Sequence, residues 1–323
     1  MEIKHSVLIV TFNHEQYIRQ CLDSVVNQSC LPFEIIISDD HSNDKTWDII
    51  KTYKSKHQNL FHIYRNEKNL GIFENIAKIK SMARGNIISF LAGDDYYMPH
   101  TLGEISKSIH QYNLNPDIDS FIIALNSIHK YPNGKEWVWN NFKYKNYEKM
   151  RLRLRFGLSY RSVGLSKSLI SKVPSEKDVL EINKSFALGA DWIKGFEEVR
   201  LADEIICVNY AGPVYRLGSG ITSKISLKSG VQSKLRLITY IEDHYSEYWD
   251  SRDLRYIKSL KFSNLYMLNP NFINFVLSLF YSIININNHT SNYPWIRSLK
   301  IYLPNNMLKF VKNNIYPLVR KFI

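Results

Sequence analysis

The sequence predicts an α/β protein: a mixed, mostly parallel sheet with helices on both faces, followed by a C-terminal helical region. Two observations lead to this class. Short, wholly apolar runs alternate with segments of helical periodicity through the first third of the chain, which is the pattern of a parallel sheet. From Lys228 onward the pattern is helical, with breaks at Pro270, Pro294 and Pro304.

Four strands are expected in the first part of the chain. They are short and apolar, as strands buried on both faces are. They lie at 7–10, 34–38, 61–64 and 86–91.

Three helices separate these strands. The first has apolar residues one turn apart from Ile18 to Val26, the amphipathic helical spacing. The second contains Trp47, Ile50 and Tyr53, and Asn43 or Asp44 can cap it. The third begins at Gly71 and is expected to end at Gly85.

The pattern changes after about residue 115. We expect a strand at 121–125, a hairpin at 128–139 that turns at Asn133-Gly134, and shorter strands at 163–169 and 204–210 around a helix near Asp191. The predicted organisation is a catalytic domain at 1–225, with a nucleotide-binding half at 1–115 and an acceptor half at 116–225. A helical region follows at 226–323.

Composition restricts the class of protein. The net charge is +12, and no Asp or Glu follows Asp253, so the basic tail favours an anionic partner. The three cysteines have no disulfide or metal spacing, which favours a reducing, cytoplasmic compartment. The N-terminus does not resemble a signal peptide, and the apolar stretch at 272–284 is shorter than the roughly 20 residues of a membrane span.

Polar residues gather at the predicted carboxyl ends of the strands, where open parallel sheets bind ligands. They are Thr11, Asn13 and His14, then Asp39, Asp40, Ser42 and Asp44, then Arg65, Asn66, Asn69 and Gly71, and finally Asp94 and Asp95.

Asp94 and Asp95 are adjacent carboxylates at the end of a buried strand. They repel each other unless a positive charge joins them, and Mg²⁺ or Mn²⁺ prefers such oxygen ligands. The alternative is a helix N-cap ahead of Pro99 and Leu102.

Five segments together carry a resemblance to a known family. They are VLIVTFN at 7–13, EIIISDDHSNDKT at 34–46, the Asn69-Leu70-Gly71 turn, GNIISFLAGDD at 85–95, and Pro99. In this order and spacing they resemble family 2 glycosyltransferases of the GT-A fold, over roughly residues 5–220.

The resemblance implies roles for individual residues. Nucleotide-sugar contacts fall on Thr11, Asn13, Asp39, Asn69, Asp94 and Arg216. Asp39 would accept a hydrogen bond from N3–H of uracil, Asp94 would lie near the ribose, and Asp95 would hold Mn²⁺ or Mg²⁺ at the diphosphate. The commoner family form has a further Asp at the position of Ala92, which leaves the division of roles near the sugar open.

The resemblance also implies a general base and a late loop. Asp191, ahead of a predicted helix, fits the base, and its alternative role is an N-cap. Trp192 is either a sugar-stacking wall or part of the core. Arg216 lies in the 215–220 segment, which resembles the loop that closes on the donor; it would contact the diphosphate, or be a solvated surface residue. One base without a second nucleophile implies a single displacement with inversion.

The predicted function is therefore transfer of a sugar from a nucleotide-sugar, expected to be a UDP-sugar, to a carbohydrate acceptor. By family analogy the acceptor is linked to a lipid diphosphate, in synthesis of a bacterial surface polysaccharide such as an O-antigen or a capsule. A sugar-phosphate nucleotidyltransferase would show a Gly-rich basic loop after the first strand. A nucleic-acid-binding protein would interleave basic and aromatic residues on one module. Neither pattern is found, and no nucleic-acid partner is expected.

The basic tail has its own prediction. Its apolar stretches carry aromatic residues, among them Trp295, Tyr302 and Tyr316. Such a surface suits peripheral binding to an anionic leaflet, the inner face of the cell membrane. The alternative is that these helices pack on the catalytic domain or form a homo-oligomer interface.

Overall fold

The computed structural model describes residues 2–140, 148–150, 154, 163–175, 190–219, 226–271, 273–274 and 276–278. The chain divides into two compact units. The first comprises Met1–Lys184 and Ala190–Lys224, and the second comprises Ser185–Gly189 and Ile225–Ile323.

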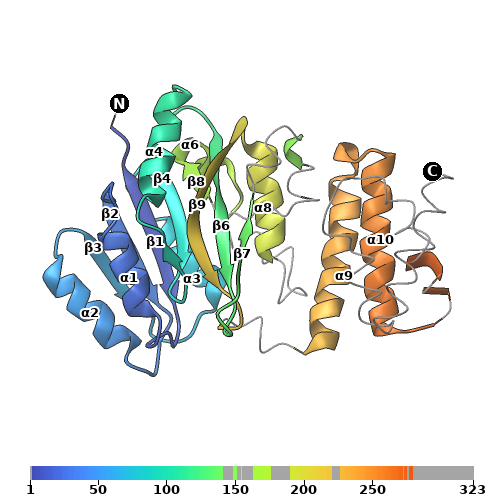
Figure 1. The fold of residues 1–323 in the computed structure, drawn as a ribbon, viewed down its shortest axis with the longest axis horizontal. Coiled ribbons are helices and arrows are strands. Elements are labelled where there is room, and N and C mark those ends of the chain that lie inside the picture. The colour runs from blue at the N-terminus through green and yellow to red at the C-terminus, as the bar shows by residue number, and fades with distance from the viewer. Residues whose placement is uncertain are drawn as a thin grey trace. The chain divides into compact units, whose positions relative to one another are not determined.

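One sheet organises the first unit (Figure 1). Its strands are β1 (His5–Thr11), β2 (Glu34–Asp39), β3 (Phe61–Arg65), β4 (Ile87–Ala92), β5 (Tyr96–Tyr97), β6 (Phe121–Lys130), β7 (Glu136–Trp139), β8 (Val163–Ser166) and β9 (Glu204–Arg216). Among the described residues their order is β3-β2-β1-β4-β8-β6-β9-β5, with β7 paired to β6. β1 to β4 are mutually parallel, as is the β6–β9 pair, whereas β8 runs antiparallel to both its neighbours. The predicted mixed sheet is confirmed.

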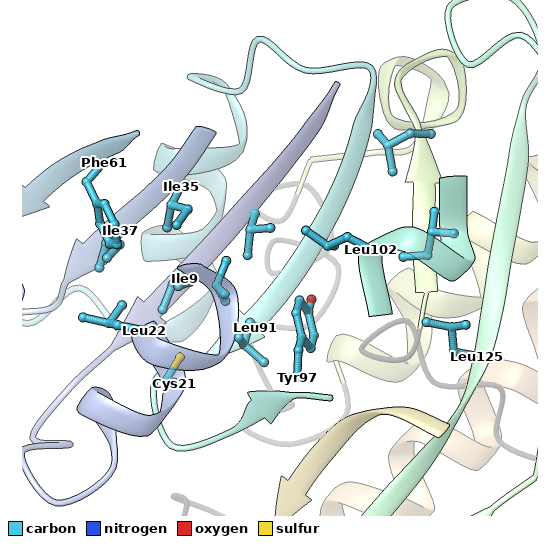
Figure 2. Packing of buried hydrophobic residues seen from close by; sticks show 14 of the residues in the cluster. Ile9, Cys21, Leu22, Ile35, Ile37, Phe61, Leu91, Tyr97, Leu102 and Leu125 are labelled. Atoms are coloured by element: carbon cyan, nitrogen blue, oxygen red, sulfur yellow. The ribbon is translucent and has the colours of Figure 1, made fainter. Parts of the chain in front are cut away.

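Helices cover both faces of this sheet. They are α1 (Ile18–Val26), α2 (Thr46–Lys56), α3 (Ile72–Lys80), α4 (Thr101–Gln111), α6 (Lys167–Lys172) and α8 (Ala190–Leu201). Side chains of α1, α2 and α4 share one apolar core with alternate residues of β1, β2 and β4. Figure 2 shows part of this core, including Cys21 and Leu22 of α1 against Ile9, Ile35 and Ile37. The period-two alternation of strands puts Leu8 and Ile36 on the other face, where α3 packs against β1 and β2.

Several boundaries differ from the prediction. β6 continues to Lys130 and β9 continues to Arg216, beyond the predicted ends at residues 125 and 210, and two further differences have a local cause. The helix that starts at Gly71 ends at Lys80, and Gly85 is not its cap. A Cβ at Gly85 would lie 2.3 Å from the carbonyl oxygen of Lys4, so glycine is needed there for the close approach to β1. The predicted strand at 163–169 stops at Ser166, because Ser166 Oγ accepts a hydrogen bond from Leu169 N–H (3.2 Å) and caps α6.

The second unit contains α9 (Leu227–His244), a short 3₁₀ helix (Ser246–Tyr248) and α10 (Ser251–Leu268). Asp250 and Asp253 form a capping box at the start of α10, which ends before Pro270 as expected. Lys261 of α10 pairs with Glu242 of α9 at 2.6 Å. No helix in the described part of the chain is long and apolar enough to cross a membrane. The aromatic residues of the predicted membrane surface, Trp295, Tyr302 and Tyr316, lie outside the described residues.

Candidate active site

The carboxyl ends of four neighbouring strands bring predicted site residues to one edge of the sheet. Thr11, Asp39 and Arg65 end β1, β2 and β3, and they are register partners in adjacent strands. Asp94 and Asp95 follow β4, which pairs with β1. Because parallel strands end at the same edge, these residues become neighbours although they are far apart in sequence.

The loop after β1 is fastened to the loop after β2. Asn13 adopts a left-handed conformation (φ 54°), which Asn tolerates better than most residues. Its backbone N–H donates to Ser42 Oγ (2.9 Å), and its side-chain Oδ1 accepts from Asn43 N–H (2.8 Å). Asn13 therefore sets the shape of this edge through contacts within the protein.

Thr11 and His14 lie beside Gly93. Thr11 Oγ1 is 3.1 Å from His14 Nδ1, and His14 Nε2 is 4.0 Å from Asp94 Oδ2. A Cβ at Gly93 would lie 2.5 Å from Thr11 Oγ1, so a glycine is needed for Thr11 to lie this close to the chain after β4. Burial lowers the pKa of His14 despite the nearby carboxylates, chiefly Asp94. The ring is therefore neutral near pH 7 and adds no positive charge to the site.

Asp39 is fully enclosed by the protein, with no exposed side-chain surface. Ser42 donates to it twice, from its hydroxyl to Oδ1 and from its backbone N–H to Oδ2 (3.2 Å). Arg65 Nε lies 3.3 Å from Oδ2. Burial raises the pKa of Asp39, and the hydrogen bonds from Ser42 and the charge of Arg65 offset this only in part.

The neighbouring Asp40 holds the turn that contains Asn69. Its Oδ1 accepts from the backbone N–H of Leu70 (2.8 Å) and from Asn66 Nδ2 (2.8 Å), and its Oδ2 accepts from Gly71 N–H (2.8 Å). Asn69 Nδ2 in turn donates to the carbonyl oxygen of Asp40 (3.3 Å). Asp40 is thus a structural carboxylate, and it fixes Asn69 at the edge where Asp39 lies.

Strand β9 brings Arg216 to the carboxylate pair. Its backbone N–H donates to Asp95 Oδ1 (2.9 Å), and its guanidinium donates to the carbonyl oxygen of Asp94 and to Gln20 Oε1. Ser219, three residues later, donates from Oγ to Asp94 Oδ2 (2.8 Å). The segment that begins at Arg216 is therefore attached directly to both carboxylates.

Two aromatic rings hold the same guanidinium. Its central carbon is 5.0 Å from the ring centroid of Tyr17 and 4.8 Å from that of Tyr96. Cation–π contacts of this kind stabilise a guanidinium in one orientation. Neither tyrosine was predicted from the sequence, in which the one signal was that Tyr96 directly follows the carboxylate pair.

The expected base, Asp191, belongs to the first turn of α8, and its side chain lies outside what the structure describes. Lys194 of this helix makes a contact with the sheet. Lys194 and Glu198 form a buried pair at 3.7 Å, and Lys194 Nζ lies 4.6 Å from the ring centroid of Phe90 in β4. The helix that carries Asp191 is thus packed on the strand that leads to Asp94.

The chemistry of Asp94 and Asp95 fits a divalent cation. Both residues are buried, at 7% and 3% exposure, and carboxylate oxygens are the ligands that Mg²⁺ and Mn²⁺ take. Within the described residues, no group of three or more His, Cys, Asp or Glu side chains could hold a metal ion. A cation at this pair would need further oxygen ligands, which the phosphates of a nucleotide supply.

Comparison with known proteins identifies the class. Residues 6–173 match the model of Glycosyl transferase family 2, and the chain belongs to this family. This favours the glycosyltransferase prediction over the nucleotidyltransferase and nucleic-acid-binding alternatives. The chain spans 31–32% of the length of the curated Mycobacterium relatives that it matches, and 56% of a Methanocaldococcus jannaschii relative.

Three similar proteins illustrate the likeness. The chain is 38% identical over 97 residues to the poly(ribitol-phosphate) beta-glucosyltransferase of Bacillus spizizenii, covering 29% of this chain and 15% of that protein. S. aureus TarS 1–349 in complex with UDP-GlcNAc has a TM-score of 0.59 at 17% identity, over 98% of this chain and 86% of that one. A Pyrobaculum calidifontis mannosyltransferase with GDP-Man and Mn²⁺ has a TM-score of 0.52 at 12% identity, over 100% and 83%. The structural likeness supports the GT-A fold.

Proposed function

We propose that this chain is an inverting glycosyltransferase that moves a sugar from a UDP-sugar to a hydroxyl group of a carbohydrate acceptor. The observation that carries the proposal is the joint placement of Asp94, Asp95 and Arg216. The Arg216 backbone binds the Asp95 carboxylate and its guanidinium binds the backbone carbonyl of Asp94, so a carboxylate pair and a fixed positive charge lie side by side, which suits a diphosphate leaving group. Family membership supports the reaction class, and the UDP-GlcNAc complex of TarS supports the donor class.

The residues at the ends of β1, β2 and β4 would bind the nucleotide half of the donor. In this proposal Thr11 lies against the nucleotide, Asp39 lies on the base side, and Asp94 lies near the ribose. Asn13 and Asn69 contribute by fixing the two loops that border the nucleotide, as their hydrogen bonds within the protein indicate.

The reaction requires stabilisation of the negative charge that develops on the leaving diphosphate. Asp95, with Asp94 beside it, would hold Mn²⁺ or Mg²⁺, which when bound neutralises negative charge on phosphate oxygens. Arg216 supplies a permanent positive charge at the same place. Because Tyr17 and Tyr96 already hold its guanidinium, little reorganisation is needed when the donor binds.

Asp191 is the proposed general base. It would take the proton from the acceptor hydroxyl while that oxygen attacks the anomeric carbon and the bond to the diphosphate breaks. One displacement inverts that carbon, so an α-linked UDP-sugar gives a β-linked product. Trp192, which is 36% exposed next to the base, is the proposed wall for the acceptor sugar.

The acceptor class is argued from a relative and from the charge of the C-terminal tail. Similarity to a poly(ribitol-phosphate) glucosyltransferase supports a surface polymer as the acceptor class, and the basic tail supports a lipid-diphosphate-linked acceptor met at an anionic membrane surface. Liposome sedimentation tests the surface: binding to anionic vesicles should weaken with salt. Equal binding to neutral vesicles, or none to either, leaves packing or oligomerisation as the role of the tail.

The experiment for the central proposal is hydrolysis and transfer from UDP-glucose, UDP-galactose and their N-acetyl forms. Activity should require Mn²⁺ or Mg²⁺, vanish in EDTA, and be lost in Asp95→Asn. Asp117→Asn is the matched control, because Asp117 is a solvent-exposed acid that accepts a hydrogen bond from Asn86 Nδ2 (3.4 Å), at the amino end of β4. Full activity of Asp95→Asn in EDTA contradicts the assignment.

A further inference from the structure

Arg65 is held on three sides by the protein. Its Nε lies 3.3 Å from Asp39 Oδ2, its Nη2 donates to the carbonyl oxygen of Ser42 (2.6 Å), and its central carbon is 5.9 Å from the ring centroid of Trp47. A guanidinium has donors in a rigid planar fork, so these contacts fix the direction of every remaining N–H.

The third nitrogen of this guanidinium, Nη1, has no hydrogen-bond partner among the described residues, and the side chain is 40% exposed. Arg65 therefore combines an immobilised frame with accessible donors at the carboxyl end of β3. Asp39, its register partner, is completely enclosed behind it. A ligand that approaches Asp39 from solvent meets the Arg65 side chain at the surface.

We propose that Arg65 is a specificity-determining residue of the donor site: its Nη1 donates a hydrogen bond to a ring carbonyl oxygen of the nucleobase, and Asp39 is the positioning residue behind it. This rests on the proposed function, since it needs a nucleotide at this edge. In this proposal the base is contacted directly by the exposed guanidinium of Arg65, and not by the enclosed carboxylate of Asp39 as the sequence predicts.

The chemistry of the contact defines which bases fit. Uracil carries a carbonyl oxygen at C4, where cytosine carries an amino group. Arg has donors only, so it pairs with the carbonyl and opposes the amino group. A site with a fixed guanidinium therefore selects UDP over CDP, while the two nucleotides are alike in ribose and diphosphate. A hydrogen bond to a charged group is worth about 1.5–3 kcal/mol, or roughly 10- to 150-fold in affinity.

The test is calorimetric titration of UDP and CDP, each with Mn²⁺, into the wild type and into Arg65→Lys. Lysine keeps the positive charge beside Asp39 but lacks the planar fork that can hold Asp39 and reach the base at once. Arg84→Lys is the matched control, because Arg84 also pairs through Nε with a buried carboxylate, Glu34, at the opposite end of β2. Thermal unfolding of each variant checks that the fold is retained.

We expect the wild type to prefer UDP, Arg65→Lys to lose about tenfold or more in UDP affinity with CDP affinity little changed, and Arg84→Lys to keep the wild-type preference. Equal losses for UDP and CDP in a folded Arg65→Lys overturn the assignment and leave the donor proposal intact. Wild-type protein that binds both nucleotides equally also overturns it. Wild-type protein that binds neither rejects the donor site itself. If Arg65→Lys fails to fold, the double variant Arg65→Met/Asp39→Asn, which removes both charges together, replaces it with the same expected loss of preference.

Discussion

Strand β2 begins and ends with a buried carboxylate, and the two ends behave differently. Glu34 opens the strand and Asp39 closes it, and neither has more than 1% of its side chain exposed. Each pairs with the Nε of a partly exposed arginine, Arg84 at 2.9 Å and Arg65 at 3.3 Å. Both ends of β2 therefore have a buried carboxylate paired with an arginine.

The difference lies in how fully the protein satisfies each carboxylate. Burial alone would raise the pKa of Glu34, but hydrogen bonds from Ser6 Oγ (2.6 Å) and from the backbone (2.6 Å) and side chain of Arg84 lower it overall. At Asp39 burial prevails and the pKa is raised. The ionised form of Glu34, at the amino end of β2, is thus stabilised by its partners, whereas the ionised form of Asp39, at the carboxyl end, stays unfavourable. In this account one end maintains the fold and the other serves binding.

The largest effect should come from the proposed base, Asp191. Asp191→Asn should lower kcat by about 10²–10⁴-fold, the usual scale for a general base, with UDP binding retained. Glu197→Gln, an acid on the same helix, is the control and should change kcat little. Loss of UDP binding in Asp191→Asn without a separate effect on turnover would give Asp191 a structural role.

The next effect concerns stability at the amino end. Glu34→Gln removes the charge that Arg84 and Ser6 satisfy, and it should lower the free energy of unfolding by about 2–3 kcal/mol. UDP affinity per folded molecule should stay at the wild-type value. Urea unfolding and titration of the same preparation check both, and a weakened UDP affinity would remove the distinction between the two ends.

Two glycines sharpen the comparison, because one lies at each end of β4. A Cβ at Gly85 would meet backbone atoms, Lys4 O at 2.3 Å and Ser6 N at 2.9 Å, whereas at Gly93 it would meet the side chains of Thr11 and His14. Gly85→Ala should therefore cost about 1–3 kcal/mol of stability. Gly93→Ala should cost less stability but weaken UDP binding. The reverse ranking in unfolding experiments would contradict this account.

The pH dependence should have opposite signs at the two ends. The pKa of Glu34 is below its ordinary 4.5 in the folded protein, so its stabilisation is complete above that pH and is lost as pH falls through the folded pKa. The pKa of Asp39 is above its ordinary 3.8, so its ionised form costs stability above the folded pKa, and that cost disappears as pH falls. Unfolding of the wild type, Glu34→Gln and Asp39→Asn at pH 3–7 measures how each carboxylate changes the free energy of unfolding with pH. The same sign for both carboxylates would contradict the opposite pKa shifts.

Local sequence patterns were sufficient for the parallel half of the sheet. The apolar runs predict β1 to β4, and the polar residues that follow them, from Thr11 to Asp95, do meet at one edge. The placement of Arg216 beside the carboxylate pair agrees with the resemblance to the family. What the residues at these positions do for a donor stays a prediction.

Local sequence patterns could not predict contacts between segments that are far apart in the sequence. The rings around Arg216 come from Tyr17, which precedes α1, and from Tyr96 of β5, a two-residue strand that exists only through its pairing with β9. The fork of Arg65 is held by segments on either side of α2's start, Ser42 and Trp47. Likewise Gly85 gives the signal of a helix end, but the tertiary approach of Lys4 is what requires it.

The most direct test of the division between the two ends is UDP affinity together with unfolding free energy for Asp39→Asn and Glu34→Gln. Asp39→Asn removes a charge whose burial is unfavourable, so the account predicts stability near the wild-type value and UDP affinity reduced about tenfold or more, because Arg65 loses its anchor. Glu34→Gln should show the converse, lower stability with unchanged UDP affinity. An Asp39→Asn protein that binds UDP like the wild type while unfolding more easily than Glu34→Gln would contradict the account.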